Sequence, residues 1–255
     1  MIVDCHTHWH PDWAKGAPTD PTAWLGVLDR HGIGHAIVLP TRGLFDDTLI
    51  EADNNEVAAV CRASSGRMIP FCTVRLWQEA RALAELDRCL GPLGFQGIKF
   101  HPWVQAVPVN HVLMDGVCER AVAAGVPILF HDGTPPCSLP SQIGLLARRH
   151  PRATLILGHC GLLEYWEEAI EVLRRFENVW GCLCGPHPAA MREIARAAPL
   201  ERLCWGSDFG FGNTDLVDYR LRLFRAAELR DNEQARILYE NPRRLIRTIP
   251  QAPVS

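Results

Sequence analysis

The sequence predicts a single-domain (β/α)8 barrel, the TIM-barrel fold, and three observations predict it. Short apolar runs that end in polar residues alternate with segments of helical periodicity along the chain. The chain has 255 residues, a common size for one such barrel. No linker or composition shift interrupts the alternation, so we expect residues 1–255 to form one domain, with C-terminal helices over residues 216–247 packing on the barrel.

The first expected strand covers residues 1–8, and a loop rich in Pro, Gly and Trp follows over residues 10–19. Asp20 and a proline then begin a helical pattern that ends near Gly32, which matches the usual start and stop signals of a helix. Residues 36–39 form an apolar run that is too short for a helix, so they predict the second strand.

Residues 41–47 are expected to be a loop, and residues 49–63 have helical spacing. The alternation then repeats to the end of the chain. We expect further strands at residues 68–74, 97–101, 127–131, 154–159, 178–183 and 202–207. We expect further helices at residues 78–90, 111–124, 141–150, 163–176, 188–198, 216–229 and 233–247.

Strands that are separated by helices pair in parallel. Because helices cover such a sheet and bury its strands, these strands are continuous apolar runs in the sequence. Eight units of this kind close into a barrel whose reactive face lies at the carboxyl ends of the strands. A doubly wound open sheet is the main alternative. No G-x-G-x-x-G or G-x-x-x-x-G-K-[ST] motif follows an expected strand, so the barrel is favoured.

Composition indicates a soluble globular protein, with 47% hydrophobic residues, 22% charged residues and a net charge of -3. The 26 Lys and Arg residues are scattered among acids, so we expect no nucleic-acid partner and no membrane-binding patch. No secretory signal and no apolar run of bilayer length are apparent. The ten cysteines include no C-x-x-C pair, so we expect free thiols and a cytoplasmic location.

Side chains that can bind metal or move protons recur at the expected strand ends. They are His6 and His8 on the first strand, Lys99 and His101 on the fourth, His131 on the fifth, His159 on the sixth and Asp208 on the eighth. His6 and His8 are two residues apart, so they project from one strand face and can bind one ion together. A single strand-end histidine is more often structural. Coincidence is nevertheless a poor explanation for five inward-facing residues together, namely His6, His8, His131, His159 and Asp208.

These positions carry motifs by which the sequence resembles the amidohydrolase superfamily, in particular the amidohydrolase-related (amidohydrolase 2) family, which includes aminocarboxymuconate semialdehyde decarboxylase-type proteins. The motifs are Asp-Cys-His-Thr-His at residues 4–8, Gly-Ile-Lys-Phe-His-Pro at 97–102, Leu-Phe-His at 129–131, Gly-His-Cys-Gly at 158–161, Trp-Gly-Ser-Asp at 205–208 and Glu-Asn-Pro-Arg-Arg-Leu at 240–245. Each motif is short, and their order and spacing together are specific.

The resemblance implies that His6, His8, His131 and Asp208 bind one divalent ion, with water or substrate in the open position. Zinc is the expected ion, and Mn²⁺ or Fe²⁺ could replace it. His159 would be the nearby catalytic histidine. In hydrolysis, Asp208 would accept the water's proton and pass it to the leaving group, while the metal and His159 polarise the scissile carbonyl. In a decarboxylation, the same groups would protonate the carbon that loses CO₂.

Further residues are candidates for substrate binding: Lys99, His101, Arg42, Arg75, Trp9 and Trp103. Other amidohydrolase subgroups use a carboxylated lysine on the fourth strand to bridge two metals, so Lys99 is either such a bridge, a partner for an anionic substrate or a structural support. The two arginines lie in expected loops, where solvated side chains are the commoner case. Cys160 follows His159 and is expected to point to the opposite face and pack.

The sequence therefore predicts a metal-dependent hydrolase that acts on a small amide, lactone or ester. The alternative enzyme is a zinc-dependent non-oxidative decarboxylase of an unsaturated or aromatic carboxylic acid. A barrel that binds metal or ligand without turnover is a third possibility, against which the intact ligand set argues. The expected partner is a small-molecule substrate, and the resemblance implies a homodimer.

Overall fold

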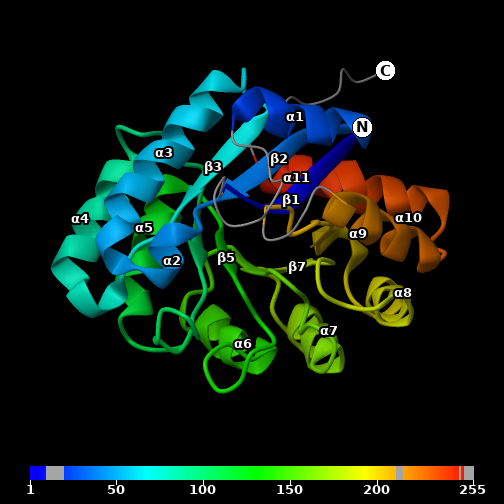
Figure 1. Cartoon of the computed structure of the whole chain (residues 1–255). Coiled ribbons are helices and arrows are strands. Elements are labelled where there is room, and N and C mark those ends of the chain that lie inside the picture. The colour runs from blue at the N-terminus through cyan, green and yellow to red at the C-terminus, as the bar shows by residue number, and fades with distance from the viewer. Residues whose placement is uncertain (10–19, 211–214, 247, 250–255) are drawn as a thin grey trace.

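The computed structural model describes residues 1–9, 20–210, 215–246 and 248–249, so the predicted loop at residues 10–19 and Arg247 lie outside it. Eight strands form one parallel sheet in chain order (Figure 1). They are β1 (Ile2–His8), β2 (Ile33–Leu39), β3 (Met68–Cys72), β4 (Gly97–Phe100), β5 (Ile128–Phe130), β6 (Leu155–Leu157), β7 (Val179–Cys182) and β8 (Leu203–Cys204).

Backbone hydrogen bonds between β1 and the segment after β8 close the sheet into a barrel. The amide of Cys5 donates to the carbonyl of Trp205 at 2.9 Å, and the amide of Asp208 donates to the carbonyl of His6 at 2.8 Å. The buried Asp4 carboxylate adds a further link, because its Oδ1 accepts from the amide of Ser207 at 2.9 Å. The predicted (β/α)8 barrel is therefore confirmed.

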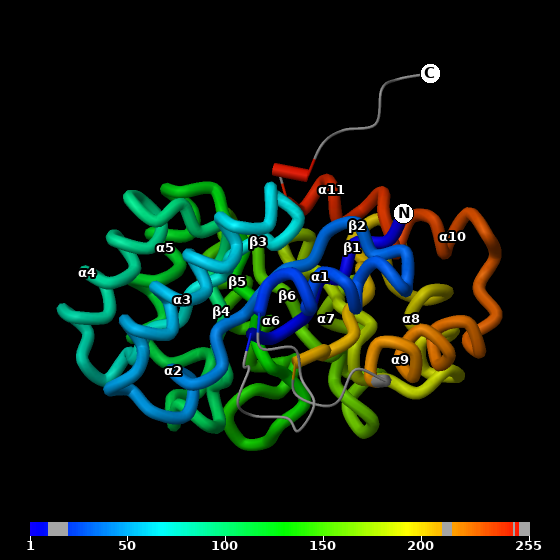
Figure 2. The backbone as a smooth tube through the Cα atoms, turned by 45° about the horizontal axis from the view of Figure 1, so that its top comes forward, coloured from blue at the N-terminus to red at the C-terminus, as the bar shows by residue number. Residues whose placement is uncertain are grey.

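Helices surround the barrel, as the tube in Figure 2 shows. They are α1 (Pro21–Arg30), α2 (Arg42–Phe45), α3 (Ile50–Ala63), α4 (Glu79–Leu90), α5 (Met114–Ala124), α6 (Pro140–Arg149), α7 (Trp166–Arg175), α8 (Pro188–Ala197), α9 (Asp215–Ala226), α10 (Asp231–Ala235) and α11 (Asn241–Leu245). Asp20 caps α1 as the sequence predicts, since its carboxylate accepts from the amide of Ala23 at 2.9 Å. Among the described residues, no helix is long and apolar enough to cross a membrane.

Two apolar cores result from this arrangement. The larger lies between strands and helices. The smaller includes alternate strand residues such as Val3, Ile37 and Leu129, together with Leu245 of α11. Asn241 fixes α11 to the barrel by donating to the carbonyls of Leu200 and Leu203 at 2.7 and 2.8 Å. Polar side chains of the site lie at the carboxyl ends of the strands.

A predicted strand, a predicted loop and a predicted helix differ from the structure. The strand expected at residues 202–207 is shorter, because β8 ends at Cys204 and the residues after it bond with β1. The expected loop at residues 41–47 contains α2, because the Asp53 carboxylate accepts from the amides of Thr41 and Gly43, each at 2.9 Å, and satisfies donors at the start of this helix. The expected helix at 233–247 is divided by a π-helical segment at Arg236–Glu240. Pro242 follows this segment and cannot donate the hydrogen bond that would continue a regular helix.

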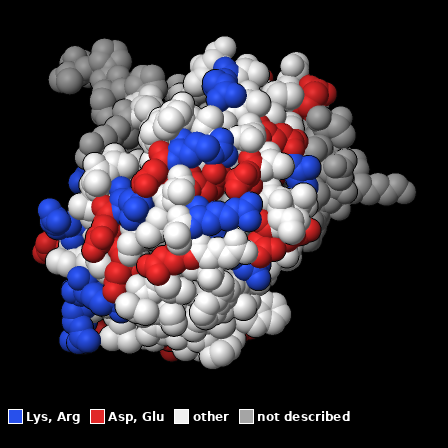
Figure 3. All heavy atoms as spheres, turned by 90° about the vertical axis from the view of Figure 1, so that its left-hand side faces the viewer, with Lys and Arg blue, Asp and Glu red and all other residues white. Residues whose placement is uncertain are grey.

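Charged side chains are mixed on the face that Figure 3 shows, where Lys and Arg lie beside Asp and Glu. Arg81 pairs with Glu51 at 2.9 Å and Arg120 with Asp87 at 2.9 Å. On this face the arginines are distributed among acids, as the sequence predicts.

Candidate metal centre

Two histidines and one carboxylate meet at the mouth of the barrel. Oδ1 of Asp208 lies 3.5 Å from Nε2 of His6 and 3.5 Å from Nε2 of His8. Ligand atoms of these three residues all lie within 4.8 Å of one another. Asp208 has a positive φ of 62°, a conformation that aspartate tolerates better than most residues. This backbone turn directs the carboxylate back towards β1.

The other ring nitrogen of each histidine is engaged. Nδ1 of His6 lies 3.1 Å from the carbonyl oxygen of Gly158, and Nδ1 of His8 lies 3.2 Å from the hydroxyl of Thr41. Because a carbonyl only accepts, Nδ1 of His6 carries the hydrogen and Nε2 presents its lone pair to the mouth. Contacts of this kind orient histidine ligands in metal sites.

Two glycines allow the strands to converge on His6. A Cβ atom at Gly158 would lie 2.4 Å from the carbonyl oxygen of Phe130, and one at Gly206 would lie 2.5 Å from Cβ of His6. Both distances are far below van der Waals contact. A larger residue at either position would therefore push apart the backbone segments that carry the site.

Burial keeps the histidines of the site neutral. It holds the pKa of His6, His8 and His159 well below the usual range, with the charge of Lys99 contributing to each shift. Burial raises the pKa of Asp208, whereas the charge of Lys99 opposes this rise. Neutral imidazoles with available lone pairs beside a carboxylate are suitable metal ligands, so these residues fit a divalent ion.

Lys99 lies inside the barrel, where its register partner on β5 is Leu129. Its side chain is fully buried, and Nζ lies 3.2 Å from Nε2 of His6. Burial lowers the pKa of Lys99 to about 8. Lys99 thus lies beside His6, and its role remains a prediction.

His131 and His101 form a stacked pair beside this group. Their ring centroids are 3.8 Å apart with an interplanar angle of 10°. Nε2 of His131 lies 2.9 Å from the hydroxyl of Thr134, and the His131 ring lies 4.4 Å from that of His159. Burial lowers the pKa of His131 to about 2 and that of His101 to about 3. His131 lies next to the metal group but is not one of its three members, so its ligand role remains a prediction.

Sequence reasoning missed Asp132, which positions His159. This buried carboxylate accepts from the amide of His159 through Oδ1 and from the amide of Gly161 through Oδ2, each at 2.6 Å. Burial raises the pKa of Asp132 to about 7. Its place directly after the strand-five histidine was a signal that could have identified it.

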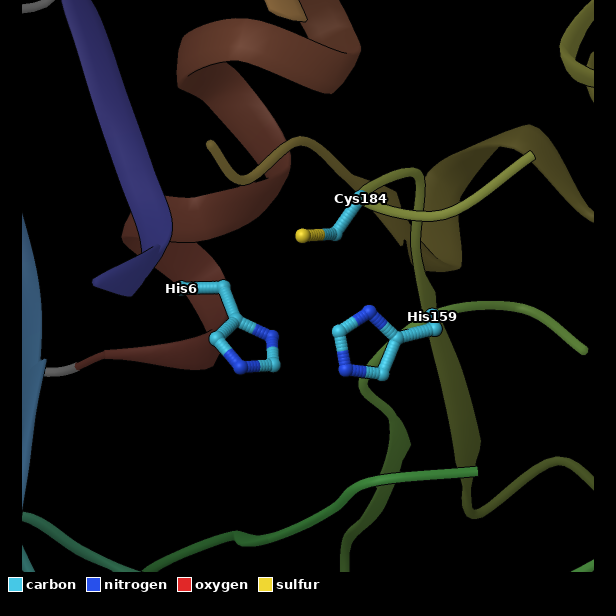
Figure 4. A group of neighbouring side chains, drawn as sticks. All are labelled: His6, His159 and Cys184. Atoms are coloured by element: carbon cyan, nitrogen blue, oxygen red, sulfur yellow. The ribbon is translucent and has the colours of Figure 1, made fainter. Parts of the chain in front are cut away.

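The approach of Cys184 to two histidines was also missed. Ligand atoms of His6, His159 and Cys184 all lie within 4.8 Å of one another (Figure 4). Cys160 instead packs in the outer core, as predicted. Cys184 follows the end of β7, a position at which a ligand is expected on a barrel, and that placement was the available signal.

The remaining substrate-binding candidates have protein partners or lie at the surface. Arg42 forms ion pairs with Glu56 and, at 3.4 Å, with Asp53. The other three are placed as follows: Arg75 lies 3.8 Å from Asp47, the buried Trp9 donates its indole N–H to Glu56 at 2.8 Å, and Trp103 is 58% exposed. Their substrate roles remain predictions.

Comparison with known proteins places these observations in a family. The model of the family described as Amidohydrolase matches residues 3–248. No curated protein sequence matches the chain significantly.

Solved structures with the same fold include two decarboxylases. The 2,6-dihydroxybenzoate decarboxylase from Rhizobium has a TM-score of 0.73 and 19% identity, over 96% of this chain and 98% of that chain. The 5-carboxyvanillate decarboxylase from Sphingomonas paucimobilis has a TM-score of 0.73 and 16% identity over the same shares. A probable 2-pyrone-4,6-dicarboxylic acid hydrolase from Acinetobacter baumannii, with citric acid bound, has a TM-score of 0.68 and 16% identity, again over 96% and 98%.

Proposed function

The chain belongs to the amidohydrolase family, and on that premise we propose that it is a metal-dependent hydrolase that cleaves a small amide, lactone or ester. The observation that carries the proposal is the convergence of His6, His8 and Asp208 within 4.8 Å at the barrel mouth. Three protein ligands, here from β1 and the segment after β8, are the usual set of a catalytic zinc site.

Zinc is the ion we propose, held by His6, His8 and Asp208 with His131 as a fourth ligand. Neutral imidazoles and a carboxylate suit Zn²⁺, and Mn²⁺ or Fe²⁺ are the alternatives. When bound, the ion would supply Lewis acidity and lower the pKa of a coordinated water to about 7.

Asp208 would handle the proton of the reaction. Burial raises its pKa, which makes its carboxylate a better base than an exposed aspartate. It would accept a proton from the attacking water and deliver that proton to the leaving group, so the carboxylate is regenerated at the end of each cycle.

His159 and Lys99 would act on the substrate. His159 is neutral in its buried position, and an imidazole N–H can donate a hydrogen bond to the carbonyl oxygen as negative charge develops there. Asp132 holds the backbone of His159 in place. Lys99 contributes a cation at the mouth, which favours a substrate that carries a carboxylate.

A decarboxylase of an unsaturated or aromatic carboxylic acid is the second candidate. Two of the structures with this fold are named decarboxylases of aromatic acids, which is the observation that favours it. In this reaction the same proton-handling group would protonate the carbon that loses CO₂. A homodimer and a cytoplasmic location also remain predictions.

A substrate panel would separate the two reactions. Purified protein would be incubated with lactones, esters, amides and aromatic carboxylic acids while released acid and CO₂ are measured. Hydrolysis without CO₂ release would support the main proposal, and CO₂ release would favour the second candidate. Asp218→Asn, on the exposed side of α9, is the matched control for Asp208→Asn. Equal turnover by these two variants would contradict both reactions as written.

A further inference from the structure

A second group of side chains at the barrel mouth combines two imidazoles with a thiol. Ligand atoms of His6, His159 and Cys184 lie within 4.8 Å of one another, and Figure 4 shows the Cys184 sulfur directed towards the space beside the two rings. All three residues are buried, with 0%, 3% and 0% exposure. They come from β1, the turn after β6 and the segment after β7, so the grouping depends on the barrel and not on local sequence.

The His159 ring lies among the other imidazoles of the mouth. Its centroid is 4.7 Å from that of His6 and 4.4 Å from that of His131. Two imidazoles and a thiol therefore bring nitrogen and sulfur donors to one buried space.

The fold holds these side chains together. A Cβ atom at Gly185 would lie 2.9 Å from the carbonyl oxygen of His159 and 3.0 Å from its Cβ, so only glycine lets the segment after β7 approach so closely. Gly158 likewise allows β6 to approach His6, since a Cβ there would lie 3.1 Å from Cε1 of that ring. Asp132 fixes the backbone of His159. The approach of thiol and imidazoles is therefore a property of the scaffold.

We propose that His6, His159 and Cys184 form a second metal position that takes a thiophilic divalent ion such as Zn²⁺ or Cd²⁺. Thiolate and imidazole are the ligands that such ions prefer. On binding, the S–H bond of Cys184 breaks, the sulfur forms a bond to the ion and the proton passes to solvent; no electron is transferred. This position goes beyond the proposed function, which gives Cys184 no part. It uses His6 of the group His6, His8 and Asp208, and it uses His159, to which the proposed function gives a role on the substrate. Because Nδ1 of His6 donates to Gly158, only Nε2 can bind an ion, so an ion occupies one of the two positions at a time.

Cobalt provides a direct test, because a thiolate ligand gives Co²⁺ a charge-transfer band in the near ultraviolet that nitrogen and oxygen ligands do not. Metal-free full-length protein would be titrated with Co²⁺ alone under reducing, oxygen-free conditions. We expect the band in the unmodified protein, in His8→Ala and in Cys160→Ser, the matched control at a buried cysteine beside His159. We expect its loss in Cys184→Ser and in His159→Asn.

Cys184→Ala serves as a second variant, with circular dichroism showing that it folds, and should also lose the band. Cobalt binding to the unmodified protein without the band, or a band that persists in folded Cys184→Ser, would overturn the proposal. The cobalt experiment can fail independently of the proposed function. A normal band in a protein that turns over no substrate contradicts only the proposed hydrolase activity. Full turnover without the band contradicts only the metal position that includes Cys184.

Discussion

Oδ1 of Asp208 lies 3.5 Å from Nε2 of His8, so the turn after the last strand of the barrel meets the end of the first. The amide of Asp208 donates to the carbonyl of His6 at 2.8 Å and fixes this approach in the backbone. The two histidines of β1, His6 and His8, are thereby joined by a carboxylate that lies about two hundred residues later in the chain.

Replacing Asp208 by asparagine should remove most of the activity. The amide cannot accept and return a proton, so kcat/KM should fall by about 10²- to 10⁴-fold, the range for loss of a general acid–base group. Steady-state kinetics on an identified substrate measure this, with Asp218→Asn as the surface control. Retention of more than about half the activity in Asp208→Asn would mean that another group moves the proton.

Asp132→Asn should affect catalysis through the position of His159. Asparagine has one accepting oxygen, so it cannot satisfy both amides that Asp132 accepts from at 2.6 Å. One buried N–H is left unsatisfied, which costs about 1–3 kcal/mol of unfolding free energy. We expect lower kcat with little change in metal content. Loss of metal at unchanged kcat per bound ion would contradict a positioning role for Asp132.

Lys99→Met tests whether the buried lysine bridges two metals. Nζ lies 3.2 Å from Nε2 of His6, and burial lowers the pKa of Lys99 to about 8. If Lys99 is a cation that attracts a substrate carboxylate, the variant should raise KM for acidic substrates and keep its metal. A second ion that requires both bicarbonate and Lys99 would instead identify a carboxylated bridge.

Glu85 should give the fold a defined acid sensitivity. Burial raises its pKa, but hydrogen bonds from Arg88 and Asn54 outweigh burial and hold the pKa below the ordinary 4.5. The folded state therefore favours the ionised form, and the stability that Glu85 contributes is present above pH 4.5 and is lost as pH falls through its lowered pKa. Denaturant unfolding of the wild type and Glu85→Gln should show a stability difference that shrinks at acidic pH. The exposed Glu164→Gln is the control, and a difference that does not change with pH would contradict this assignment.

The order of strands and the positions of the strand-end residues could be predicted because they depend on local sequence. Apolar runs and helix signals gave eight alternating units, and the polar residues that follow them lie at the mouth. The end of the last strand could not be predicted. The residues after Cys204 no longer pair with β7 and instead form backbone hydrogen bonds with β1. This pairing joins opposite ends of the chain, so a local sequence pattern cannot predict it.

Side-chain direction limited the prediction of the site. His131 was predicted from its strand end, but its rotation towards Thr134 and its stacking on His101 depend on packing across strands. The approach of Cys184 to His159 was not predicted, because it depends on Gly185 and the neighbouring β6 turn. Asp132 was missed because its partners are backbone amides of another segment.

Metal content and its removal test the central claim most directly. Purified protein should contain a tightly bound divalent ion, lose activity when a chelator removes it and regain activity when Zn²⁺ is restored. His8→Ala should bind the proposed catalytic ion poorly, since the variant lacks one of the three ligands His6, His8 and Asp208. Protein that binds no divalent ion, or that keeps full activity after complete metal removal, would contradict the account.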